Sequence, residues 1–195
     1  GQRGWRDAPA DPDQLAVQLL ILGGTLFLGR HLAAQALARG HRVTLFHRGQ
    51  TQPELFPEAG HVRGDRDGGL AALDGRRWDA VIDTSGYLPR VVRDAARRLA
   101  PNVGHYTLVS SISVYAEPMQ APVLESHPLA TLADPADEAL TGASYGALKA
   151  LCEHAVEAEL PGRALQVRPA SGAKRAACTL AGFSNSALTA TECER

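Results

Sequence analysis

The stretch that decides the fold reads Val17-Gln18-Leu19-Leu20-Ile21-Leu22-Gly23-Gly24-Thr25-Leu26-Phe27-Leu28-Gly29-Arg30-His31-Leu32. An apolar run ends at two glycines, and apolar residues then return at helical spacing until Gly40. This pattern predicts a strand, a tight turn and a helix. Such a junction presents backbone N–H groups and the positive end of a helix dipole at the carboxyl end of the strand, which suits a pyrophosphate.

The glycine spacing is close to that of a dinucleotide-binding turn. Gly23 suits the tight turn, and Gly29 would let the helix pack closely on the strand. When the spacing G-x-x-G-x-x-G is laid on these two residues, the middle position is Leu26. The glycines alone therefore favour a nucleotide site and an ordinary turn about equally.

Composition narrows the class of protein. The chain has 195 residues, 45% of them hydrophobic, which suits one domain with a sizeable core. A net charge of -1 gives no reason to expect nucleic acid or an anionic membrane as a partner. Cys152, Cys178 and Cys193 lack the paired spacing of a metal site, so no metal is expected and a reducing, cytoplasmic setting is the simpler interpretation. No apolar run approaches the ~20 residues of a membrane-spanning helix.

Strand and helix patterns alternate along the rest of the chain. Apolar runs predict strands over 15–22, 42–46, 60–63, 79–83, 106–110 and 164–168, and helical periodicity marks about 88–99 and 144–160. This order predicts an α/β fold, a Rossmann-type doubly wound parallel sheet with helices on both faces and ligands at the carboxyl ends of the strands.

The segments outside these elements differ in character. Residues 1–14 have no periodicity and predict a disordered leader, whereas 15–169 form the predicted dinucleotide-binding domain. The segment 117–142 has four prolines and five acids but no Lys or Arg, and a loop this long often covers a site. Residues 170–195 form an atypical tail without a core-forming pattern.

Two groups of side chains could carry chemistry. Tyr145 and Lys149 are four residues apart on the predicted helix, so the phenol and the ammonium would share one face. A close cation favours the phenolate, although a chance exposed pair is the alternative. Ser110, Ser111 and Ser113 follow a predicted strand, and a hydroxyl there could bond a substrate oxygen while the tyrosine moves a proton. The alternative for the serines is an ordinary turn.

Taken together, these motifs resemble the short-chain dehydrogenase/reductase superfamily, in its extended, NAD-dependent epimerase/dehydratase branch. The resemblance runs from about residue 19 to residue 169. The residues that support the resemblance are Gly23-Gly24-Thr25-Leu26-Phe27-Leu28-Gly29, Asp83-Thr84-Ser85-Gly86, Ser110-Ser111-Ile112-Ser113-Val114-Tyr115, and Tyr145 with Lys149.

The resemblance implies a role for each matching position. Tyr145 would be the general acid/base, Lys149 would hold the nicotinamide ribose and depress the pKa of the tyrosine, and Ser111 would orient the substrate. Asp65 is similar in placement to the contact with adenine. The full set of implied cofactor-binding residues is Gly23, Thr25, Leu26, Phe27, Gly29, Arg48, Asp65, Thr84, Ser85, Gly86, Tyr145 and Lys149.

The end of the second predicted strand bears on the choice of cofactor. An acidic residue there would bind the adenosine ribose hydroxyls of NAD, whereas an arginine accommodates the extra phosphate of NADP. In this chain Phe46 is followed by His47 and Arg48, with no acid. The expected cofactor is therefore NAD(P), with NADP favoured over NAD, while a solvent-facing turn arginine is the alternative.

The sequence thus predicts an NAD(P)-dependent oxidoreductase or epimerase/dehydratase that acts on a hydroxy or keto compound such as a nucleotide sugar. Its expected partner is this small-molecule substrate, and a homodimer is compatible with the sequence. Relatives form the substrate pocket from further strands and helices, which 170–195 do not resemble, so the alternative is a catalytically impaired NAD(P)-binding module. The turn also resembles chloroplast RNA-binding relatives, but the stretch without Lys or Arg between Arg98 and Lys149 argues against phosphate-backbone binding.

Overall fold

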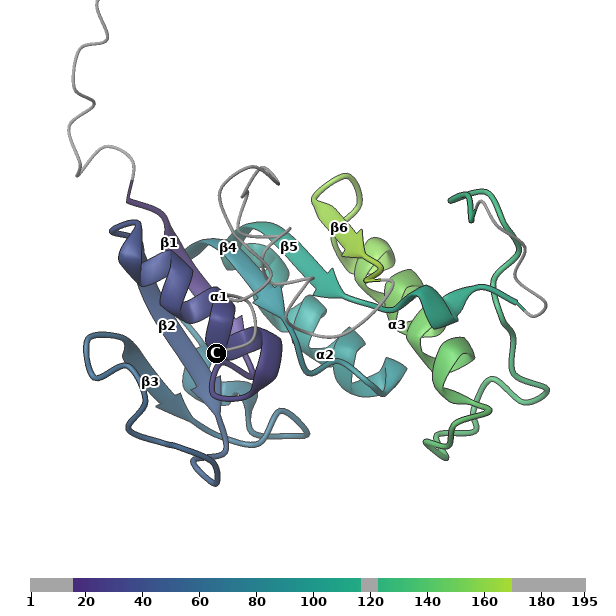
Figure 1. The fold of residues 1–195 in the computed structure, drawn as a ribbon, viewed down its shortest axis with the longest axis horizontal. Helices are drawn as coiled ribbons and strands as arrows, with labels where there is room; N and C mark the ends of the chain where they lie inside the picture. Colours follow the sequence, from purple (N-terminus) through teal and green to yellow (C-terminus); the bar gives the residue numbers. More distant parts are fainter. Residues whose placement is uncertain (1–15, 117–122, 170–195) are drawn as a thin grey trace, which may run out of the picture.

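A six-stranded sheet, in which every pairing is parallel, forms the centre of the molecule. The computed structural model describes residues 16–116 and 123–169. Across the sheet the strand order is β3-β2-β1-β4-β5-β6 (Figure 1). The strands are β1 (Gln18–Leu22), β2 (Arg42–His47), β3 (Gly60–Arg63), β4 (Trp78–Asp83), β5 (Val103–Val109) and β6 (Ala164–Val167).

Three helices and three short 3-10 turns complete the described chain. The helices are α1 (Phe27–Ala38), α2 (Pro89–Leu99) and α3 (Tyr145–Glu159). The 3-10 turns are η2 (Leu70–Leu73), η3 (Ala100–Asn102) and η4 (Ile112–Val114). None of the helices in this part of the chain is long and apolar enough to cross a bilayer.

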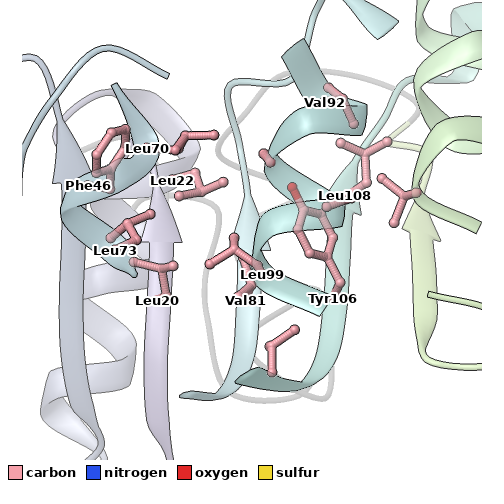
Figure 2. Close-up of a cluster of buried hydrophobic side chains, with 14 of the residues drawn as sticks. Leu20, Leu22, Phe46, Leu70, Leu73, Val81, Val92, Leu99, Tyr106 and Leu108 are labelled. Atoms are coloured by element: carbon pink, nitrogen blue, oxygen red, sulfur yellow. The ribbon is translucent and has the colours of Figure 1, made fainter. Parts of the chain in front are cut away.

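The alternation of side chains along β1 explains why both faces of the sheet are covered. Leu19 and Ile21 pack into a core shared with α1, whereas Leu20 and Leu22 pack into the core beneath α2 and α3. Figure 2 shows part of this second core, in which Leu99 of α2 faces β-strand residues such as Val81. Burial on both faces accounts for the continuous apolar run in the sequence. The predicted Rossmann-type fold is confirmed.

The predicted elements are all present, with shifts of a few residues at their ends. The first strand begins at Gln18, later than the predicted 15, and the fifth begins at Val103, earlier than the predicted 106. The predicted leader (1–14) and the predicted tail (170–195) both lie wholly outside the described residues.

The order in which the chain connects the strands indicates where a ligand should bind. From β1 the chain moves outward to β2 and β3, and then returns to add β4 on the other side of β1. The strand order therefore reverses between β1 and β4. In open parallel sheets, ligands bind at the carboxyl ends of the strands on either side of such a reversal.

Candidate functional site

A cleft of about 930 Å³ lies at the carboxyl ends of the strands. The turn after β1, the ends of β2 to β5 and the start of α3 all contribute to its lining. The structure brings to this cleft twelve of the thirteen residues predicted for the site, namely Gly23, Thr25, Leu26, Phe27, Gly29, Arg48, Asp65, Thr84, Ser85, Ser111, Tyr145 and Lys149. The remaining one, Gly86, is buried beside the cleft, where its carbonyl oxygen accepts a hydrogen bond from Lys149 Nζ.

Glycine is required in the turn between β1 and α1 for two different reasons. Gly23 has a φ of +90°, which lies in the left-handed region. At Gly29 a Cβ atom would collide with the carbonyl oxygen of Gly23, so the absence of a side chain lets α1 pack directly on the turn. Leu26, at the position where a third glycine was considered, has an ordinary φ of -129° and makes no side-chain capping bond. A leucine is therefore accommodated, and the first amides of α1 are left for a ligand.

Phe27 is an exposed apolar residue at the mouth of the cleft. Its φ is 41° and its side chain is 76% exposed. A phenylalanine in the left-handed region is strained, and strain of this kind gathers at ligand sites. The sequence placed Phe27 in the site but carried no signal for this backbone conformation.

Lys149 is a buried cation held by backbone carbonyls. Its Nζ donates to the oxygens of Gly86, at 2.6 Å, and Val109, at 2.7 Å. Burial lowers the pKa of Lys149. An ammonium has three donors, so one N–H remains after these two bonds. Both Tyr145 and Lys149 line the cleft, although no hydrogen bond joins them in the described chain.

Tyr145 and the serines after β5 converge near Lys149. Tyr145 is the first residue of α3 and lies half-buried in the lining of the cleft. A Cβ atom on the following residue, Gly146, would collide with the carbonyl oxygen of Ser113, so a glycine here lets α3 approach η4 closely. Ser111 Oγ accepts from the Ser113 amide at 3.1 Å, which leaves its hydroxyl proton to donate elsewhere. Ser110 Oγ is buried with no partner in the described chain.

A second tyrosine, which the sequence did not single out, lies at the same end of the cleft. The ring of Tyr87 is 6.5 Å from that of Tyr145 between centroids, and Lys149 Nζ lies 5.7 Å from the Tyr87 centroid. Burial raises the pKa of Tyr87, and the nearby Tyr145 raises it further. Its position directly after the Asp83–Gly86 motif was the available signal.

A buried ion pair supports the floor of the cleft. Arg66 Nη1 and Nη2 donate to the two carboxylate oxygens of Asp83 at 2.6 and 2.7 Å. Tyr106 OH and the Ser85 amide donate to the same carboxylate at 2.8 and 3.0 Å. Burial alone would raise the pKa of Asp83, but Arg66 outweighs it and lowers the pKa. The group ties β4 and β5 to the segment after β3.

A further ion pair fixes α3 against β6. Arg168 donates from Nε and Nη2 to the two oxygens of Glu153 at 3.0 and 2.6 Å, and from Nη1 to Tyr115 OH at 2.8 Å. The side chain of Glu153 is only 4% exposed. Because α3 carries Tyr145 and Lys149, this pairing contributes to their placement.

Exposed charges line the opposite, outer end of the cleft. Arg48 follows β2, and its guanidinium makes no hydrogen bond or ion pair within residues 16–116 and 123–169. Asp65 accepts from the amide of Asp67, and Asp67 in turn pairs with Arg90. Arg90 also contacts Glu138 of the 123–144 segment at 3.4 Å. That segment therefore reaches the cleft, and Glu138 and Leu140 contribute to its lining.

No protein-family model matches the chain. Among curated proteins it is similar to the chloroplast stem-loop binding protein of 41 kDa b from Arabidopsis thaliana, with 30% identity over 114 residues that cover 50% of this chain and 30% of that protein. Among solved structures it is similar to the Bordetella bronchiseptica enzyme WbmG in complex with NAD and UDP, with 18% identity, a TM-score of 0.64 and coverage of 78% of this chain and 53% of that one. A UDP-galactose 4-epimerase gives 23% identity, a TM-score of 0.58 and coverage of 77% and 55%.

The chain thus spans about half the length of these solved structures. The matches carry the same arrangement that the described residues have, a parallel Rossmann sheet with helices on both faces. The chain accordingly has the fold of the short-chain dehydrogenase/reductase superfamily, as found in its NAD-dependent epimerases and dehydratases.

Proposed function

We propose that this chain binds a nicotinamide dinucleotide and contributes the acid/base machinery of an oxidoreductase or epimerase/dehydratase. The main observation behind this proposal is that the turn before α1 lines the same cleft as Ser111, Tyr145 and Lys149. No side chain of the N-cap residue bonds to the first amides of α1. The solved structures that share the fold include proteins that hold NAD or act on UDP-galactose, which supports the same general kind of chemistry here.

The residues present fit a dinucleotide. The close packing at Gly29 exposes the first amides of α1 to a diphosphate, and the third N–H of Lys149 is left for a ribose hydroxyl. The Ser110 hydroxyl, which is buried without a partner among the described residues, adds a polar group to the lining of the cleft. When bound, the nicotinamide ring would supply hydride transfer, which is chemistry no side chain can provide.

The proposed roles of the protein groups follow from their chemistry. The Tyr145 hydroxyl would give or take a proton at a substrate oxygen, and the Ser111 hydroxyl would donate a hydrogen bond to the same oxygen. The buried Lys149 would orient the cofactor ribose through its third N–H. Tyr87 would form one wall beside Tyr145. A hydroxy or keto compound such as a nucleotide sugar is the substrate class we propose.

We propose NADP as the preferred cofactor. Arg48 is exposed, lines the cleft and has no carboxylate partner in the described chain, so it is available for the 2′-phosphate. A calorimetric titration with NADPH and NADH tests this. Arg48→Ala should weaken NADPH binding selectively, whereas Arg42→Ala, at the other end of the same strand, should not.

Three variants test the general proposal, by the same binding titration and by a measurement of redox turnover. Tyr145→Phe should keep cofactor binding and lose any redox turnover. Gly29→Ala should abolish binding because its Cβ has no room, whereas Gly142→Ala meets nothing within 4 Å and serves as the matched control. Tight binding by Gly29→Ala would contradict the site.

Measurements of cofactor binding, turnover and RNA binding also separate two alternative functions. Cofactor binding without turnover on any nucleotide sugar would favour a binding module. Salt-sensitive binding of stem-loop RNA, without cofactor binding, would favour the activity for which the Arabidopsis relative is named. The carboxylates at the outer end of the cleft disfavour that second alternative.

A further inference from the structure

Two histidines form a chain of hydrogen bonds at the end of β2. His47 Nε2 lies 2.9 Å from His61 Nδ1, and His61 Nε2 lies 3.1 Å from the carbonyl oxygen of Phe56. The amide of Gly49 donates to His47 Nδ1 at 3.0 Å. The two imidazole rings meet edge to face with their centroids 5.2 Å apart. Every ring nitrogen in the pair therefore has a partner.

The donors and acceptors in this chain determine both tautomers. A backbone amide only donates, so Nδ1 of His47 is an acceptor and carries no proton. The proton of His47 lies on Nε2 and is donated to Nδ1 of His61. His61 then carries its proton on Nε2 and donates it to the carbonyl of Phe56. In this arrangement a second proton on either ring would place two donors face to face.

The surroundings of His47 favour its neutral form. The side chain of His47 is buried, and the groups that act on it are His61 and Arg63 of β3 and Glu54 of the preceding loop. Burial lowers the pKa of His47 most, His61 and Arg63 lower it further, and Glu54 opposes them.

The pair also determines the shape of the turn that carries Arg48. The bond from the Gly49 amide to His47 closes this turn around Arg48, and Gly49 has a φ of +75°. His47 and Arg48 line the cleft, but His61 is not part of its lining. A change at His61 therefore does not touch a ligand in the cleft directly, and its hydrogen bond to His47 links it to the turn.

We propose that the His47–His61 pair is a positioning device for cofactor discrimination, which holds the Gly49 turn so that Arg48 faces the 2′-phosphate of NADP. The inference rests on the proposed cofactor site and names the part of the chain that selects between its two ligands. NADH lacks the 2′-phosphate, so its binding does not depend on the placement of Arg48. Disturbing the pair should accordingly weaken NADPH binding and leave NADH binding almost unchanged.

Two substitutions at His61 test the proposal. His61→Leu removes both ring nitrogens and should weaken NADPH binding about tenfold, with little change for NADH. In His61→Gln the amide oxygen can accept from His47 Nε2 and the amide nitrogen can donate to Phe56, so this variant should recover most of the NADPH affinity. Urea unfolding of both variants is measured alongside. An equal loss for both cofactors would indicate a merely structural role and overturn the proposal, as would unchanged NADPH binding in His61→Leu.

Nitrogen NMR of the cofactor-free protein provides an independent measurement. Both histidines should give the pattern of the Nε2–H tautomer near neutral pH, and His61→Leu should shift the amide signals of Arg48 and Gly49. An Nδ1–H tautomer at His47 would overturn the positioning. If the wild type binds neither cofactor, the proposed function and the discrimination both fail. If it binds NADH as tightly as NADPH, only the discrimination fails.

Discussion

Arg66 and Asp67 are neighbours in the chain, yet their side chains form ion pairs in opposite surroundings. Arg66 turns inward and donates to both oxygens of Asp83, whose side chain is 0% exposed. Asp67 turns outward and accepts from two nitrogens of Arg90 at 2.8 and 2.9 Å, with the two side chains 54% and 48% exposed. The hydrogen-bond geometry is nearly the same in both pairs, so burial is what distinguishes them.

Burial changes what happens when a pair is broken. In the outer pair, water replaces the lost partner, and exposed ion pairs typically contribute little to stability. In the inner pair, where the side chains are 14% and 0% exposed, removal of one partner leaves a largely buried charge without its counter-charge, which is strongly destabilising. The inner pair also adjoins the cleft, whose lining includes Arg66, and connects the segment after β3 to the end of β4. The two pairs thus offer a controlled comparison within one loop.

The largest expected effect comes from Asp83→Asn. This substitution keeps the shape of the side chain but leaves the largely buried guanidinium of Arg66 without its counter-charge, so the free energy of unfolding should fall by about 3–5 kcal/mol. Urea unfolding followed by circular dichroism measures the loss. Asp74→Asn, which breaks the exposed pair with Arg98, is the matched control and should have little effect. A small loss in Asp83→Asn would contradict the role of burial.

Acidification should reveal the same pair in the wild type. Burial tends to raise the pKa of Asp83, but Arg66 outweighs it, so the folded-state pKa lies below the unfolded value of about 3.9. A lowered folded-state pKa means that the stabilisation is fully present above the unfolded pKa and is lost as pH falls through the folded one. Below about pH 4, the unfolding free energy of the wild type should therefore decrease more steeply than that of Asp83→Asn. Parallel pH profiles for the two proteins would show that Asp83 does not titrate in this way.

Tyr106→Phe should have an intermediate effect. The buried Tyr106 hydroxyl donates to Asp83 at 2.8 Å, and loss of a hydrogen bond to a charged group costs about 1.5–3 kcal/mol. The cost should stay below that of Asp83→Asn because Arg66 and the Ser85 amide continue to hold the carboxylate. Urea unfolding again supplies the measurement, with Tyr87→Phe as the control because its ring is half-exposed. A loss as large as that of Asp83→Asn would mean that the phenol, and not the guanidinium, is the main partner.

These pairs also mark how far the sequence could predict the structure. Apolar runs and glycine spacing were enough to predict the sheet and the turn at Gly29. Strand burial requires apolar residues and close packing requires glycine, so both can be recognised from residue type. The identity of the partner of Asp83 could not be recognised from residue type, because the pairing depends on how the segment after β3 passes over the sheet. A carboxylate at the end of the apolar run 79–83 did signal that a partner was needed. The conformation of Phe27 could not be predicted, because phenylalanine has no preference for positive φ.

The smallest effect is expected from Arg90→Gln, which breaks the outer pair. Because both partners are exposed, the urea midpoint should match that of the wild type. Arg90 also contacts Glu138, so the amides of 134–142 should exchange with deuterium faster once this link to α2 is lost. Arg93→Gln, an exposed arginine on the same helix, is the control.

Added salt should weaken the outer ion pair much more than the inner one. About 0.5 M sodium chloride shortens the screening length to a few ångströms and should reproduce in the wild type the faster exchange seen in Arg90→Gln. The same salt should leave the pair of Arg66 and Asp83 intact, because buried charges are screened much less. If Arg90→Gln instead destabilised the protein as much as Asp83→Asn, burial would not be what separates the two pairs, and the link from Asp67 through Arg90 to Glu138 would have to be counted as part of the folded core.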